Sequence, residues 1–140
     1  IHSPMERGRT GWQRLTHGFQ LSGMLQYYSA LPFNITTGSA TIQGTAARPA
    51  VNGGFIGRNT GTGFDFLCVN TRLSRKFAIR EHLRLEAMAE AFNLLNHFNG
   101  VSLNSTFGAG AWPANPAAGF GQATAAADPR GLQFALRLSF

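Results

Sequence analysis

Side chains that could perform acid–base, nucleophilic or metal chemistry are few in this chain of 140 residues and lie far apart. The four histidines lack the close spacing of metal ligands: His2, His17, His82 and His97. The single cysteine, Cys68, cannot form an internal disulfide, and we expect a small buried or inward-facing side chain there. Glu86 and Glu90, and Glu81 beside His82, do not form a recognisable acid–base pair. Nucleophile elbows, phosphate loops and dinucleotide fingerprints are also missing, so we predict no catalytic residue, metal or cofactor.

The charge of the chain is positive but dispersed. Twelve Lys and Arg oppose six Asp and Glu, for a net charge of +6, and the basic residues occur in ones and twos. Nucleic-acid binding would need a clustered basic patch, so we expect no nucleic-acid partner. Charged residues make up 13% of the chain, with 17 Gly and 12 Phe. This composition suits a β-rich chain in contact with lipid, and it also suits a Gly-rich soluble sandwich.

The elements that would position these side chains are strands, and the clearest is residues 130–140. Apolar residues occupy every second position there: Leu132, Phe134, Leu136, Leu138 and Phe140. Successive side chains of a strand point to opposite faces, so this pattern predicts one apolar face and one small or polar face. Similar alternation predicts strands at about 17–28 and 64–77. Two long loops, at about 29–63 and 97–129, are rich in Gly, Ala and Asn.

The stretch 83–96 has two interpretations. As a strand it continues the alternation, with Glu86 and Glu90 on one face. As a helix it places an apolar stripe at helical spacing, formed by Leu85, Met88, Phe92 and Leu95. Its composition favours the helix, whereas the short connection from the preceding strand favours a hairpin. No apolar run reaches the roughly 20 residues of a transmembrane helix, although a barrel strand needs only about ten residues of alternating pattern.

Several short motifs occur along the chain in an order and spacing that resemble those of one family. They are Gly18-Phe-Gln-Leu-Ser-Gly23, Ser29-Ala-Leu-Pro-Phe33, Arg48-Pro49, Gly57-Arg-Asn59, Arg84-Leu-Glu86, Glu90-Ala-Phe-Asn-Leu-Leu-Asn-His97, Phe120-Gly121, Asp128-Pro-Arg130 and Gln133-Phe-Ala-Leu-Arg-Leu-Ser-Phe140. From about residue 11 onward the chain resembles the carboxy-terminal region of a TonB-dependent outer-membrane receptor. It is most similar to the Oar-like group, whose members carry a carboxypeptidase-regulatory-like domain ahead of the plug.

The resemblance implies an all-β fold, an antiparallel transmembrane β-barrel segment of about four strands from a barrel of about 22. Residues 1–16 would be the end of a preceding strand and a periplasmic turn, and residues 17–140 the last strands of the barrel. The loops at 29–63 and 97–129 would be extracellular, and the connection at 78–82 periplasmic. The polar residues facing the lumen would be Arg72, Arg84, Glu86, Glu90 and Arg137. The signal read by the barrel-insertion machinery would be Phe134, Leu136, Leu138 and Phe140.

The resemblance also implies a function in the bacterial outer membrane. The protein would bind and import a scarce ligand, such as a metal chelate, vitamin, glycan or peptide, with energy supplied through TonB. The plug, the signal peptide and the segment that contacts the TonB complex would lie in amino-terminal parts missing from this chain. The alternative is a soluble Gly-rich antiparallel β domain that binds a partner, with Phe140 in its core.

Overall fold

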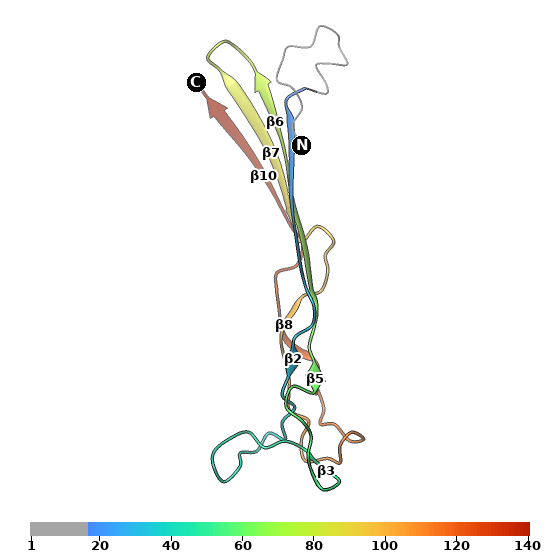
Figure 1. The fold of residues 1–140 in the computed structure, drawn as a ribbon. Coiled ribbons are helices and arrows are strands. Elements are labelled where there is room, and N and C mark those ends of the chain that lie inside the picture. The colour runs from blue at the N-terminus through green and yellow to red at the C-terminus, as the bar shows by residue number, and fades with distance from the viewer. Residues whose placement is uncertain (1–16) are drawn as a thin grey trace. The chain divides into compact units, whose positions relative to one another are not determined.

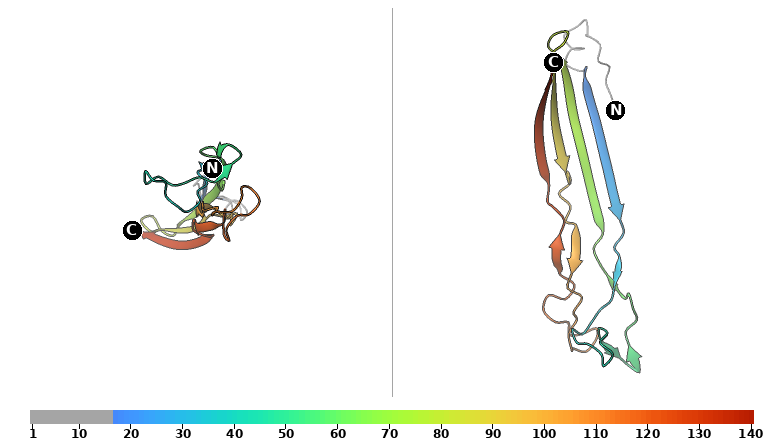
Figure 2. Two further views of the ribbon diagram at one scale, coloured as in Figure 1. Left: turned by 90° about the horizontal axis from the view of Figure 1, so that it is seen from below. Right: turned by 90° about the vertical axis from the view of Figure 1, so that its left-hand side faces the viewer.

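The computed structural model of this protein describes residues 17–140. Its main sheet contains β1 (Phe19–Tyr28), β6 (Phe66–Ala78), β7 (Arg84–Phe92) and β10 (Gly131–Ser139). These strands lie side by side in the order β1-β6-β7-β10 (Figures 1 and 2). β7 pairs antiparallel with both β6 and β10. The predicted all-β, antiparallel fold is confirmed, and the turn and strand end predicted for 1–16 lie outside the described residues.

The ambiguous stretch 83–96 forms a strand and a turn. β7 lies between β6 and β10, so its backbone is hydrogen-bonded on both sides, and this pairing outweighs the helical propensity of its residues. β7 ends at Phe92, four residues earlier than the predicted strand. Asn93 and Asn96 have φ angles of 47° and 52°, a left-handed conformation that asparagine tolerates better than most residues and that a strand cannot contain.

The connections between the four long strands differ in length. A turn at 79–83 joins β6 to β7, closed by the bond from Ile79 N to Leu83 O (2.9 Å). The other two connections, predicted as loops, contain six short strands: β2 (Pro32–Phe33), β3 (Ala50–Val51), β4 (Gly54–Phe55), β5 (Gly61–Thr62), β8 (Gly100–Leu103) and β9 (Ala123–Ala126). They pair as β2-β5, β3-β4 and β8-β9. Strands of two to four residues are too short to show a periodicity in sequence.

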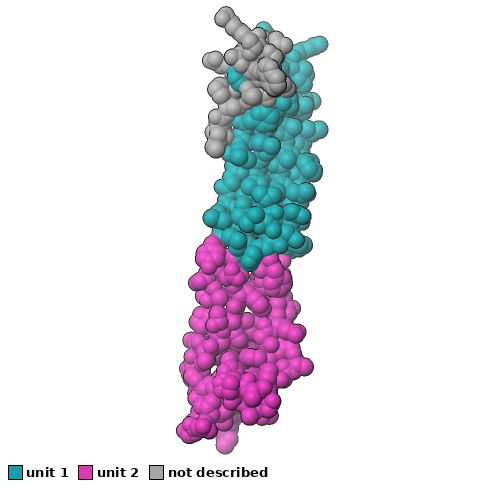
Figure 3. Space-filling view, turned by 90° about the vertical axis from the view of Figure 1, so that its right-hand side faces the viewer, with its two compact units in different colours: residues 1–26, 67–97, 128–140 teal, residues 27–66, 98–127 magenta. Residues whose placement is uncertain are grey.

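The chain forms two compact units, coloured separately in Figure 3. Unit 1 contains most of the four-stranded sheet, and unit 2 contains residues 27–66 and 98–127. Unit 2 has a small apolar core of its own, in which Ile35, Ile56 and Phe107 are at most 6% exposed. Trp112 and Phe120 pack edge-on against Phe107, with ring centroids 4.8 and 5.3 Å away. The long connections are therefore folded structures with an interior.

Candidate functional site

The register of the sheet sorts its residues onto two faces, because directly paired residues point the same way. One face carries all five residues predicted to face a lumen: Arg72, Arg84, Glu86, Glu90 and Arg137. Arg72 pairs with Glu90, and Arg137 pairs with Glu86. Arg72 Nε lies 3.6 Å from Glu90 Oε1, and the two side chains are 50% and 26% exposed. An ion pair this open to solvent contributes at most about 1 kcal/mol, so these charges remain available for other partners.

The opposite face of the sheet is apolar and uncovered. It carries four residues of β10 at alternating positions: Leu132, Phe134, Leu136 and Leu138. Phe134 and Leu136 are 77% and 76% exposed, so nothing in the described part of the chain shields them from the surroundings. Three of the four predicted insertion-signal residues thus share one face, whereas Phe140 follows the end of β10. Apolar surface of this extent requires a partner or a lipid phase.

Arg75 interrupts the apolar face. It pairs with Ala87 and therefore points to the same side as Phe77 and Leu73. Its guanidinium carbon lies 4.7 Å from the ring centroid of Phe19 and 4.6 Å from that of Phe77. Two aromatic rings can stabilise a cation through their quadrupoles in apolar surroundings. Arg75 was not among the predicted site residues, although an arginine among alternating apolar residues was a visible signal.

A cavity within unit 2 is built around the hairpin of β3 and β4. Asn52-Gly53 connects Val51 to Gly54, and Gly53 has a φ of 80°. Glycine suits this position because it adopts positive φ without steric cost, which a tight turn of this kind requires at its second central residue. Below the turn, Ile56 N donates to Pro49 O (3.0 Å), which extends the hairpin to its base. Arg48, the residue before Pro49, therefore lies at the base of the hairpin.

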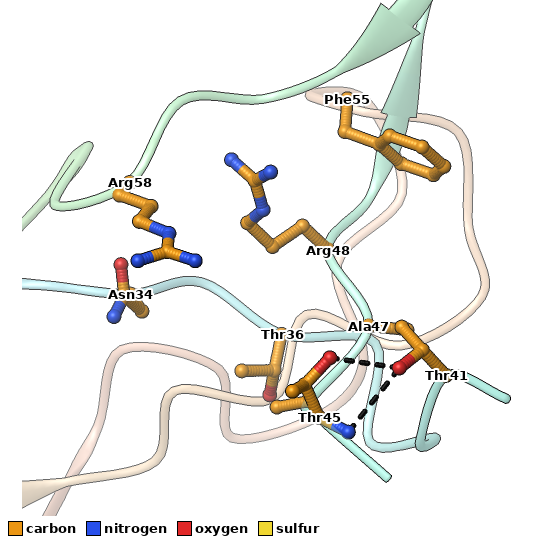
Figure 4. Close-up of a pocket in the computed structure, with 9 residues that line it drawn as sticks. Asn34, Thr36, Thr41, Thr45, Ala47, Arg48, Phe55 and Arg58 are labelled. Carbon is orange, nitrogen blue, oxygen red and sulfur yellow. Dashed lines mark hydrogen bonds between the residues drawn. The ribbon is translucent and has the colours of Figure 1, made fainter. Parts of the chain in front are cut away.

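Two further loops complete the walls of this pocket. Residues 36–47 fold back on themselves, with Thr37 N donating to Ala47 O (2.9 Å). Asn59 N donates to Asn34 Oδ1 (2.8 Å), which ties the turn after the hairpin to the segment before it. The pocket has a volume of about 320 Å³. Its lining consists of Asn34, Thr36, Thr41, Thr45, Ala46, Ala47, Arg48, Phe55 and Arg58 (Figure 4).

The pocket is cationic. Arg48 Nη1 donates to Ile56 O (2.6 Å), and this bond fixes one end of a half-buried guanidinium. In Figure 4 the guanidinium groups of Arg48 and Arg58 point toward the same space. No carboxylate lies within salt-bridge distance of either group among residues 17–140. Thr41 and Thr45 bond to each other through their hydroxyls (2.7 Å). The lining therefore offers hydrogen-bond donors and positive charge, and suits anion binding.

Metal-ligating side chains do not cluster in the described part of the chain. Within 17–140, no three His, Cys, Asp or Glu side chains gather in a way that could hold a metal ion. Cys68 Sγ donates to Asn70 Oδ1 (3.3 Å) within β6. No helix in this part of the chain is long and apolar enough to cross a membrane, a finding that does not bear on strands.

Comparison with known families identifies the chain. The model of a family described as an outer membrane beta barrel domain matches residues 46–133, more than half of the chain. The chain belongs to this outer membrane beta barrel family. No curated protein and no solved structure matches it. The barrel domain is therefore located in the bacterial outer membrane and associates with its lipid, and the alternative of a soluble Gly-rich domain is set aside.

The pocket of the barrel domain was not among the predicted sites. Arg48 and Arg58 lie in two of the sequence motifs, Arg48-Pro49 and Gly57-Arg-Asn59, but no role followed from them. One signal was available, since these are the two cationic residues of 27–66. Their convergence depends on the hairpin between them, which alternation does not reveal in strands of two residues.

Proposed function

We propose that this barrel domain is the carboxy-terminal part of a TonB-dependent receptor of the Oar-like group. Such a receptor binds a scarce ligand outside the cell and imports it with energy supplied through TonB. Two lines of support are the membership in an outer membrane barrel family and the ordered motifs that resemble this receptor group. On this proposal the described chain contributes barrel wall and ligand-binding loops, has no catalytic residue, and depends on a plug and a TonB-contacting segment that precede it in the full-length protein.

The observation that carries the proposal is the asymmetry of the connections. A short turn at 79–83 closes one end of the sheet, whereas both long connections leave from the other end, where β1 and β7 finish. Barrels of the outer membrane have short periplasmic turns and long extracellular loops. We therefore assign 79–83 to the periplasm and unit 2 to the cell exterior. A folded loop unit with a pocket is what a receptor needs on the side from which its ligand arrives.

The two faces of the sheet support its place in a barrel wall. The apolar face with Phe134 and Leu136 suits contact with lipid chains, and the face with Arg72, Glu86 and Glu90 suits a hydrated lumen. Both glutamates lie beside cations in the register. Charges arranged in this way can remain hydrated or pair with a plug, and they would be costly on the lipid side.

The test is direct binding to TonB. The full-length protein as its gene encodes it is extracted in detergent and passed over the immobilised periplasmic domain of TonB. We expect retention well above that of a small outer-membrane barrel without a plug, which serves as the control. Retention no greater than that control would refute the receptor proposal. The coding sequence upstream of Ile1 provides an independent check, because the proposal requires it to encode a signal peptide and a plug.

A further inference from the structure

We propose that the unit 2 pocket binds an anionic group of the ligand, a carboxylate or a phosphate, between Arg48 and Arg58. This inference rests on the proposed receptor function for its biological role, while the binding itself can be tested separately. The ligand class follows from the chemistry of the pocket. Guanidinium groups recognise carboxylates and phosphates through paired, charge-assisted hydrogen bonds.

The charge distribution of unit 2 is the first argument. Its three charged residues are Arg48, Arg58 and Asp65. Both cations line the pocket, and Asp65 does not. Two guanidinium groups that share one cavity repel each other when no anion lies between them. An anionic ligand removes that repulsion and gains attraction to both cations, so the pocket discriminates by charge before any other contact forms.

The fixation of Arg48 is the second argument. Its Nη1 is engaged by Ile56 O at the base of the hairpin (2.6 Å), which holds the guanidinium in place before a ligand arrives. A preorganised group loses less side-chain entropy on binding than a free one. Arg58 is exposed and follows the hairpin, so it can adjust to the ligand. One fixed and one adjustable cation form a clamp for an anion.

The volume of the pocket and its other lining residues restrict the class of ligand further. A volume of about 320 Å³ is near the lower end of small-molecule sites, which span roughly 300–1,000 Å³. The pocket therefore accommodates a small organic acid or the acidic end of a larger molecule. The side chains of Asn34, Thr36 and Thr45 can bond hydroxyl groups of such a ligand. Phe55, 66% exposed at the same pocket, offers a ring for an apolar portion.

The experiment measures binding to the purified full-length protein in detergent by isothermal titration calorimetry. The probes are citrate for a carboxylate, inorganic phosphate for a phosphate, and glucose as an uncharged comparison. We expect citrate or phosphate to bind, glucose not to bind, and the affinity for the anion to fall as salt is raised. Arg58→Gln should weaken anion binding at least about tenfold, the effect of one charge-assisted contact.

The matched control is Arg80→Gln, which removes the same charge in the turn at 79–83 and should change the affinity less than twofold. Arg48→Gln should also weaken binding, but it removes the bond to Ile56 and can disturb the hairpin. Arg58→Gln is therefore the decisive variant. Absence of binding by both anions, or equal effects of Arg58→Gln and Arg80→Gln, would overturn the anion site. Anion binding without retention on TonB would refute the receptor proposal alone, and retention without anion binding would refute the pocket alone.

Discussion

Replacing Leu136 by arginine tests which side of the sheet meets lipid. Leu136 is 76% exposed on the apolar face and lies one residue from Ala135, the midpoint of the nine-residue strand β10. Ala135 pairs with Met88 and therefore points to the opposite, polar face. The two positions share almost the same depth in the membrane and differ in the face they occupy. Ala135→Arg is thus a matched control for Leu136→Arg.

The expected change in the free energy of unfolding follows from the depth of Leu136 in the membrane. Arginine on the lipid face of a barrel costs about 2–4 kcal/mol near the midplane of the bilayer, and about 0–1 kcal/mol near the interfaces. Since Leu136 is close to the middle of its strand, we expect Leu136→Arg to lower the free energy of unfolding by about 2–4 kcal/mol. Ala135→Arg should change it by less than about 1 kcal/mol, because an arginine on a hydrated face keeps its water.

The assay is urea unfolding of the purified full-length protein, refolded into lipid vesicles and followed by tryptophan fluorescence. Folding without the cellular insertion machinery separates the energetic effect of Leu136 from its predicted role in the insertion signal. Gln133→Arg, a second substitution on the polar face, checks that any loss at Ala135 does not come from crowding against Met88. Equal losses at Leu136 and Ala135, or a larger loss at Ala135, would refute the assignment of the two faces.

Three further predictions concern single side chains. Asn93 is 4% exposed and bonds through its amide to the backbone of His97 and Asp128 (3.0–3.2 Å), so Asn93→Ala should lower the free energy of unfolding by about 2–4 kcal/mol. Asn93→Gly should recover about 1 kcal/mol of that loss, because glycine adopts positive φ without strain. A glycine variant no more stable than the alanine variant would contradict this role of the backbone conformation. Phe140→Ala should reduce assembled protein in the outer membrane of cells but not folding into vesicles, and normal membrane levels would count against its signal role. Arg75→Ala should cost about 1–2 kcal/mol through loss of the contacts with Phe19 and Phe77, and Arg75→Lys clearly less; equal losses in urea unfolding would exclude the ring contacts as the cause.

The stretch 83–96 illustrates how far local sequence can decide a structure. Its residues satisfy both a helical stripe and a strand alternation, so the two interpretations remain open when the stretch is considered alone. The structure adopts the strand because β6 and β10 both pair with it. β6 precedes it across a short turn, whereas β10 is remote in sequence. Its end at Asn93 depends on an amide that bonds to Asp128, 35 residues away. A turn stabilised by such a distant partner leaves no periodic signal.

Alternation in the sequence predicted three of the four long strands, β1, β6 and β10, and the division of their residues between two faces. This was possible because alternation of side chains is a property of the extended backbone, which every strand shows without reference to its neighbours. Membership in an outer membrane barrel family agrees with that reading. The pocket was decided only by the tertiary structure. Arg48 and Arg58 line one pocket because a hairpin reverses the chain between them and the bond from Asn59 to Asn34 ties the following turn to the segment before it. Such contacts depend on which loops fold against each other, and composition and spacing do not encode that choice.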